Sequence, residues 1–183
     1  MTSSLNYISC ETKDEHCLVY VTKPGPAHFL LETAFGKSCY RHVSLICGWD
    51  SGEFNGRVLN ALIGPAERCK KMYIITDLSW RGLLTASRAI KLCRPGRAAC
   101  LGINDDWLPI AAQAFGAEGY RIDARAEDLR AKLSAAQQSA LLRHLNVGPA
   151  SRAILTDRQE VHLEAFCHEP TVKGLKRLLR AKI

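Results

Sequence analysis

The sequence predicts an α/β fold in which a mainly parallel sheet is flanked by helices and followed by a helical C-terminal third. Short apolar runs alternate with helical segments of roughly 10 to 15 residues, which is the pattern of successive βαβ units. The last third of the chain carries helix-start signals instead, so it is expected to be all-helical.

The composition is that of one globular domain. The chain has 183 residues, of which 47% are hydrophobic and 23% charged, so it can bury a core and is not expected to be disordered. Its formal net charge of +7 fits a nucleic-acid partner, although many basic proteins bind none. No apolar run approaches the roughly 18 to 20 residues of a membrane span, and the first residues are too polar for a signal peptide. We therefore expect a cytoplasmic protein without a membrane partner.

The eight cysteines are expected to be free thiols. None belongs to a Cys-x-x-Cys pair, and the neighbours His16-Cys17 and Cys167-His168 lack the spacing that tetrahedral zinc sites usually require. In an apolar run such as that around Cys47, reduced cysteine acts as a small hydrophobic residue. The sequence thus favours buried thiols over disulfides or zinc.

Charge and hydropathy divide the chain into three segments. Residues 1–17 form a polar leader, residues 18–170 an α/β domain, and residues 171–183 a basic amphipathic helix. In the last segment, basic residues recur at helical spacing opposite an apolar face: Lys173, Lys176, Arg177 and Arg180. This basic stripe could follow DNA phosphates or be the solvated face of a packed helix, and the sequence leaves both open.

The α/β domain opens with a strand over Leu18–Thr22, which the segment Lys23–Pro26 ends. A helix is predicted over Ala27–Phe35 because its apolar residues share a face, and Gly36 is expected to end it.

The second strand is predicted over Val43–Cys47, and the glycine-rich segment Gly48–Gly56 follows it. Helical spacing resumes at Val58 and is expected to end near Gly64-Pro65. Exposed N–H groups in the glycine-rich segment could hold a phosphate, but neither the P-loop nor the dinucleotide motif is present. A simple connection is the alternative.

The third strand, Met72–Thr76, is a continuous apolar run typical of a strand covered on both faces. It ends on Asp77, and a helix is predicted over Leu83–Leu92. Ligands and metals bind at the carboxyl ends of strands in open α/β sheets. Asp77 is therefore the leading candidate for a functional acid.

A fourth strand is predicted over Ala98–Ile103, with a helix over Trp107–Phe115. Between them, Asp105 and Asp106 could hold a divalent cation or cap the following helix. We favour the cap.

The C-terminal third contains two capping-box patterns, Ser134–Gln137 and Thr156–Gln159, each of which predicts the start of a helix. A final helix is predicted from about Val172. His162 and Glu164 are expected to lie in one helix, where positions two apart point to different faces. No pair of nucleophile and base can be assigned from the scattered histidines.

Three segments of the chain together resemble a Toprim domain: Val19–Thr22, Val43–Gly48 and Tyr73–Gly82. More closely, they are similar to the Toprim domain of the Wadjet nuclease subunit JetD and its MksG relatives, kin to the A subunit of topoisomerase VI. The segment Ala153–Phe166 is similar to the family's C-terminal part, which ends in an acidic helix. The resemblance covers about Leu18 to Phe166 and implies a Rossmannoid sheet.

The chain departs from the family pattern at two acids. Lys23 stands where the family has a strand-end glutamate, and Ser79 stands where it has the second aspartate of Asp-x-Asp. Asp77 and Gly82 are in place, and Glu164 takes the position of the late acid. Lys23 could bind a phosphate directly.

The resemblance implies a metal-dependent DNA nuclease subunit of a condensin-like, SMC-like complex that acts in plasmid defence. Asp77 would hold Mg²⁺ or Mn²⁺, with Glu164 and Asp50 as further candidate ligands for a rearranged site. Lys23 and Ser79 would complete the catalytic set, and Arg81 would contact DNA together with the basic stripe. The partners implied are DNA and SMC-like ATPase subunits, while a homodimer is left open.

The missing acids favour a second function, a degenerate Toprim module that binds DNA or a partner protein without cutting. If the chain does cleave DNA alone, the leader is too short to hold the winged-helix tyrosine of the topoisomerase relatives. Hydrolysis is then expected instead of a tyrosyl intermediate.

Overall fold

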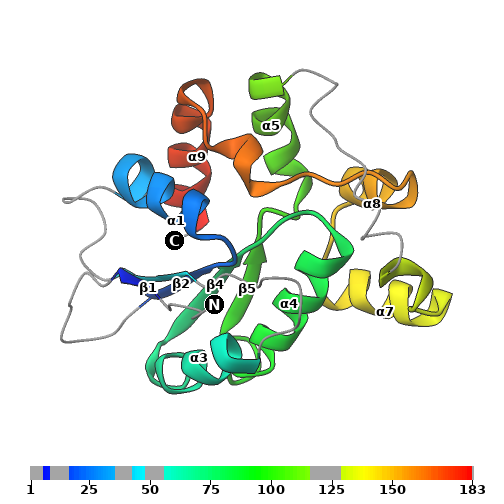
Figure 1. Ribbon diagram of the computed structural model, residues 1–183, viewed down its shortest axis with the longest axis horizontal. Coiled ribbons are helices and arrows are strands. Elements are labelled where there is room, and N and C mark those ends of the chain that lie inside the picture. The colour runs from blue at the N-terminus through cyan, green and yellow to red at the C-terminus, as the bar shows by residue number, and fades with distance from the viewer. Residues whose placement is uncertain (1–5, 9–16, 36–42, 48–55, 116–128, 183) are drawn as a thin grey trace.

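The computed structural model describes residues 6–8, 17–35, 43–47, 56–115 and 129–182. These residues form a five-stranded sheet with helices on both faces (Figure 1). The α/β prediction is therefore confirmed, including the helical part at the C-terminal end.

The strand order in the sheet is β1-β3-β2-β4-β5. The four strands β2 to β5 pair in parallel, and β1 pairs with β3 in the antiparallel direction. Their bounds are β1 Asn6–Ile8, β2 Cys17–Val21, β3 Val43–Cys47, β4 Lys71–Ile75 and β5 Ala98–Leu101. The predicted strands agree with β2 to β5 within two residues at each end, because each is a continuous apolar run bounded by polar residues. β1 was not predicted, and it lies within the segment expected to be a polar leader.

Successive strands are added on one side of β2 first and then on its other side, so the strand order reverses between β2 and β4. From β2 the chain crosses to β3 on one side, then returns past β2 to β4 and continues to β5. The two strand ends are joined by a hydrogen bond of 3.1 Å from Thr22 N–H to the Ile75 carbonyl. Such a switch point is where open parallel sheets form ligand crevices, outside the carboxyl ends of the strands. The residues that follow β2 and β4 therefore stand at the place where this topology favours a site.

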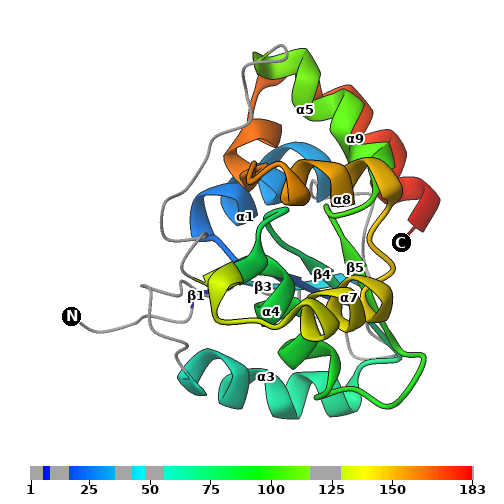
Figure 2. The same cartoon turned by 90° about the vertical axis from the view of Figure 1, so that its right-hand side faces the viewer.

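Helices cover both faces of the sheet (Figures 1 and 2). On one face lie α1 Pro24–Leu30, the π-helical turn η1 Leu31–Phe35, α5 Leu108–Phe115 and α9 Glu169–Lys182. On the other face lie α3 Gly56–Arg68 and α4 Trp80–Ile90. The central strands are consequently buried on both sides, with Val19, Val21 and Ile74 at 0% exposure.

The helices that follow β2 and β4 begin earlier than predicted. α1 starts at Pro24 instead of Ala27, because proline suits the first helical turn and Lys23 stands before it in extended conformation. α4 starts at Trp80 instead of Leu83, because the side chain of Ser79 caps it. Both helices therefore begin directly beside the end of a strand.

The predicted end of α3 at Gly64-Pro65 is wrong, since the helix continues to Arg68. Proline removes one backbone N–H from the helix. Leu62 and Ala66 are buried on either side of it, at 0% and 3% exposure. This burial holds the last turn against the body of the protein and outweighs the missing hydrogen bond.

The capping box at Ser134 is confirmed: its hydroxyl accepts from Gln137 N–H, and the Gln137 side chain accepts from Ser134 N–H. It opens α7 Ala135–His144. The second predicted box is wrong, because Thr156 is the last residue of α8 Pro149–Thr156. The Thr156 hydroxyl donates to the Arg152 carbonyl at 2.9 Å and so serves the end of a helix.

After α8 the chain runs extended instead of forming the expected acidic helix. Leu78 and Val161 form an antiparallel bridge, and a short 3₁₀ turn, η4 Leu163–Phe166, follows. Phe166 packs edge-on against Trp107 with ring centroids 5.2 Å apart. These contacts fix residues from the C-terminal third against the carboxyl end of β4.

The final helix, α9, packs its apolar face onto the domain through Leu175 and Leu179, both at 0% exposure. It begins at Glu169, three residues before the predicted start. Among the helices that the structure describes, none combines the length and the apolar character needed to cross a membrane.

Candidate functional site

Asp77 lies two residues beyond β4, at the switch point of the sheet. The next residues turn directly into α4, where the Ser79 hydroxyl accepts a hydrogen bond of 3.0 Å from Gly82 N–H. Ser79 is 4% exposed, and its side chain has a structural role as the N-cap of α4.

Gly82 is required by the close approach of α4 to the end of β4. A Cβ atom at this position would overlap the Asp77 carbonyl oxygen and lie 2.7 Å from Thr76 Oγ1. Only a residue without a side chain lets the first turn of α4 pack so tightly against the strand end. Gly82 therefore sets the position of the backbone that carries Asp77.

Lys23 reaches the same point from the neighbouring strand, β2. Its ammonium nitrogen lies 3.0 Å from Asp77 Oδ2 and 2.8 Å from Glu164 Oε2. It also lies 3.5 Å from Nδ1 of His162. Lys23 is thus held between two carboxylates, and its side chain is 30% exposed.

His162 and Glu164 are brought to Asp77 by the bridge between Leu78 and Val161. The two bridge residues exchange backbone hydrogen bonds of 2.9 and 3.1 Å. The expectation that His162 and Glu164 share one helix and point apart is wrong, because His162 precedes the 3₁₀ turn in extended conformation. Glu164 is the second residue of that turn, and a hydrogen bond of 2.7 Å from Leu163 N–H to Asp77 Oδ1 holds the start of the turn beside Asp77.

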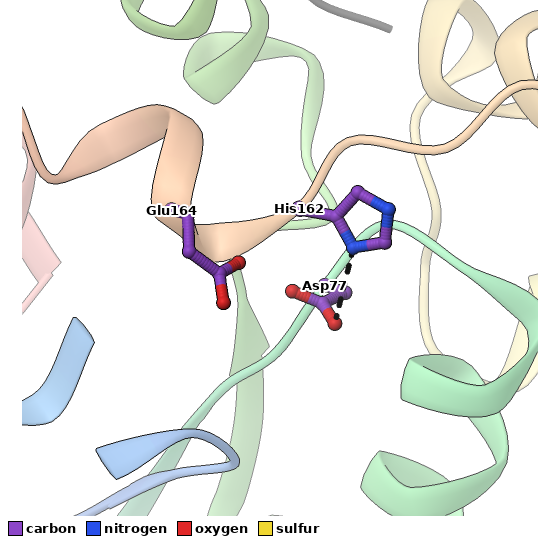
Figure 3. Close-up of side chains that lie close together, drawn as sticks. All are labelled: Asp77, His162 and Glu164. Atoms are coloured by element: carbon purple, nitrogen blue, oxygen red, sulfur yellow. Dashed lines mark ion pairs between the residues drawn. The ribbon is translucent and has the colours of Figure 1, made fainter. Parts of the chain in front are cut away.

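Asp77, His162 and Glu164 together form a candidate metal centre (Figure 3). One ligand atom of each lies within 4.8 Å of the other two. Within the described ranges, no other cluster of histidine, cysteine or acidic side chains is grouped this closely. Two carboxylates and an imidazole are a donor set that fits a divalent cation.

The charges at this centre shift one another's pKa values. Burial alone would raise the pKa of Asp77, but the facing His162 imidazole, the Lys23 charge and the Leu163 N–H outweigh it and lower that pKa. The pKa of His162 is raised, above all by Asp77, whose Oδ2 lies 3.8 Å from Nδ1. Burial would lower the pKa of Lys23, yet Asp77 and Glu164 raise it. Asp77 is therefore held as a carboxylate and Lys23 as an ammonium ion.

A cavity of about 550 Å³ opens in front of this centre. Lys23, Arg81 and His162 are among the residues that line it, together with the start of α4. Glu160 also lines it, is 3% exposed, and has its Oε2 4.0 Å from Nε2 of His162. The cavity therefore combines two basic side chains with the candidate metal centre.

Cys167 lines the same cavity. Burial, followed by the negative charge of Glu164, raises the pKa of its thiol to about 12. At neutral pH it is therefore a thiol and a poor nucleophile. The five cysteines whose side chains the structure places are free, as predicted for them: Cys17, Cys69, Cys93, Cys100 and Cys167.

The other residues predicted for a site lie elsewhere. Asp50 falls outside the described residues. Asp105 accepts hydrogen bonds of 2.8 and 3.1 Å from Ser151 N–H and Ala150 N–H. It thus caps the start of α8, a helix distant in sequence, instead of the helix that follows it as predicted.

The basic stripe lies on α9 and does not line the cavity. Lys173, Arg177 and Arg180 are exposed, and Lys176 is half-buried. Arg81, by contrast, lies at the cavity itself.

The grouping of Glu160, His162 and Glu164 beside Asp77 was not predicted from the sequence. The signal was present in the alternation Glu-Val-His-Leu-Glu, in which polar residues occupy every second position. Val161 and Leu163, between them, are 1% and 2% exposed. A strict alternation of this kind predicts an extended segment with one polar face, whereas the Thr156 capping pattern led to a helix.

Comparison with protein-family models, with curated proteins and with solved structures finds no match to this chain. The geometry of the crevice therefore carries the functional argument.

Proposed function

We propose that this chain is a metal-dependent nuclease module that hydrolyses DNA phosphodiesters at the crevice between β2 and β4. The observation that carries the proposal is the convergence of Asp77, His162 and Glu164 within 4.8 Å at the topological switch point. Crevices at that position are where open α/β sheets bind their ligands. The DNA substrate is supported by the net charge of +7 and by the basic stripe on α9.

The donor set favours Mn²⁺ over Mg²⁺. Mg²⁺ prefers oxygen ligands at nearly ideal octahedral geometry, whereas an imidazole suits transition-metal ions. Asp77 and Glu164 would supply oxygen ligands and His162 a nitrogen. A cation held there would polarise a phosphoryl oxygen and lower the pKa of a bound water.

The remaining groups of the cavity suit a phosphodiester substrate. Lys23 and Arg81 line the cavity and can neutralise the charge of the scissile phosphate. Glu160, whose Oε2 lies 4.0 Å from Nε2 of His162, would hold the imidazole of that ligand in place. Among the described residues that line the cavity, Tyr20 is the one tyrosine, and it is 2% exposed. Hydrolysis by water is therefore the reaction we propose.

A second candidate is a module that binds DNA without cutting it. It is favoured by the ion pairs of Lys23, which already neutralise Asp77 and Glu164 without a metal ion. On either proposal, an SMC-like ATPase complex acting on plasmids is the partner that the Toprim resemblance implies.

Incubation of supercoiled plasmid with the purified chain tests the proposal. Wild type is compared with Asp77→Asn and Glu164→Gln in Mn²⁺, in Mg²⁺ and in EDTA, and Lys91→Met serves as a control. Lys91 is an exposed residue at the far end of α4. Nicking that needs metal, Asp77 and Glu164, and that Lys91→Met retains, supports the nuclease. Salt-sensitive DNA binding without nicking supports the binding module. Nicking that survives in EDTA or in both acid variants would exclude this crevice as its source.

A further inference from the structure

The two carboxylates of the candidate metal centre are already occupied by a cation. The ammonium nitrogen of Lys23 lies 3.0 Å from Asp77 and 2.8 Å from Glu164. The contact with Glu164 is a charge-assisted hydrogen bond, and the contact with Asp77 is an ion pair. Lys23 therefore stands where a bound metal ion would find its oxygen ligands.

Lys23 and a divalent ion cannot share this position. Metal–carboxylate distances are about 2.0 to 2.2 Å, so an ion bound to both acids would lie in the gap that the ammonium group now occupies. The two cations would also repel each other strongly at such a separation, in a half-buried site. Binding of one requires the other to leave.

The surroundings give Lys23 a place to go. The residue stands before the first turn of α1, and a Cβ atom built on Gly25 would meet nothing within 4 Å. The 550 Å³ cavity opens beside it, and Arg81 is among the residues that line it. A phosphate in that cavity would offer the displaced ammonium group a new negative partner.

We propose that Lys23 is a displaceable counter-ion that couples metal binding to phosphodiester binding in the crevice. Without substrate, it holds Asp77 and Glu164 in ion pairs and weakens their affinity for metal. A DNA phosphate draws Lys23 away and frees the acids, and a bound metal in turn frees Lys23 for the phosphate. By linkage, the two ligands strengthen each other's binding by the same factor. This inference rests on the proposed metal centre and concerns its regulation.

Calorimetric titration with Mn²⁺ in the absence of DNA tests whether Lys23 weakens the binding of metal. Lys23→Met removes the charge but keeps an extended side chain, Lys23→Arg keeps the charge, and Lys91→Met is the matched control. We expect Lys23→Met to bind Mn²⁺ about tenfold more tightly than wild type. Lys23→Arg and Lys91→Met should remain weak binders like wild type. Thermal unfolding of each variant in EDTA verifies that it is folded.

The coupling between metal and DNA binding is tested with a duplex oligonucleotide whose linkages are phosphorothioates, so that it resists cleavage. Its affinity is measured by fluorescence anisotropy with and without Mn²⁺ at constant ionic strength. Mn²⁺ should tighten binding to wild type and to Lys91→Met by about tenfold. The gain should vanish in Lys23→Met, because that variant has no counter-ion to exchange.

The outcomes separate this inference from the nuclease proposal. Equal Mn²⁺ affinity in wild type and Lys23→Met would overturn the inference and leave the nuclease standing if plasmid is still nicked. Tighter Mn²⁺ binding by Lys23→Met without nicking by any variant would retain the counter-ion and remove the nuclease. If no folded variant binds Mn²⁺, the crevice is not a metal site and both proposals fall.

Discussion

The backbone N–H of Leu163 donates a hydrogen bond of 2.7 Å to Asp77 Oδ1, across 86 positions of the sequence. Asp77 is therefore a structural residue as well as a candidate ligand. One of its oxygens fixes the start of η4, between His162 and Glu164, and the other faces Lys23. The strand end and the C-terminal third are held together at the site itself.

This double role predicts different results for two substitutions of Asp77. Asp77→Ala leaves the buried Leu163 N–H without its acceptor and should lower the free energy of unfolding by about 1 to 3 kcal/mol. Asp77→Asn can keep that hydrogen bond through its amide oxygen and should lose less. Urea unfolding in EDTA measures both. Equal losses would mean that the hydrogen bond to Leu163 does not determine the effect.

Gly82→Ala is expected to destabilise the protein by about 1 to 3 kcal/mol, as overpacking typically does. The added methyl group would overlap the Asp77 carbonyl oxygen, which is backbone and cannot rotate away. Gly25→Ala is the matched control, because it also lies in the first turn of a helix and has open space around it. Alanine there gains helix propensity but is strained before Pro26, so the control should cost less stability than Gly82→Ala. Equal stability of the two variants in chemical unfolding would contradict the close packing described for Gly82.

The pH dependence of stability should carry the signature of His162. Its pKa in the folded chain is raised above the ordinary value of 6.5, first by its interaction with Asp77. The stabilisation is therefore complete below about pH 6.5 and is lost as the pH rises through the folded-state pKa. The difference in unfolding free energy between wild type and His162→Gln, in EDTA, should be largest below pH 6.5 and shrink as the pH is raised above that value.

A His162→Gln difference that stays constant over this range would mean that His162 gains no protonation from its partners in the folded chain.

The basic stripe on α9 should contribute to DNA binding without contributing to the metal centre. Lys173→Glu with Arg177→Glu should weaken DNA binding and reduce the slope of log affinity against log salt by about 0.9 for each lost phosphate contact. Lys91→Glu with Arg94→Glu changes the same charge at exposed positions beyond the end of α4. Anisotropy titrations at several salt concentrations distinguish the two. Equal effects of both pairs would show that net charge, and not this stripe, determines the affinity.

The strands could be predicted because a continuous apolar run has few other interpretations in a chain with this alternation. The starts of α1 and α4 were harder to predict. Lys23 and Ser79 precede these helices in extended conformation, and the sequence alone does not show at which residue the helix begins. At Gly64-Pro65, both residues signal an end in isolation. The buried contacts of Leu62 and Ala66 override that local preference.

The site was predictable only in part, because it depends on long-range contacts as well as on local sequence patterns. Asp77 could be placed at a strand end from the sequence alone, because the run before it is so regular. Its proximity to Lys23 depends on the strand order, in which β2 and β4 are neighbours although β3 lies between them in the chain. The arrival of His162 depends on the bridge from Leu78 to Val161, a long-range contact that no local pattern encodes.

The ion pair between Lys23 and Glu164 joins positions 141 residues apart. A chain synthesised from its N-terminus cannot form this contact until nearly the whole domain has emerged. Closing so long a loop costs chain entropy before any contact compensates for it, which places this step among the slow, late events of folding. Whatever chemistry the crevice performs is therefore confined to finished molecules, and a nascent or truncated chain lacks the complete set of charges.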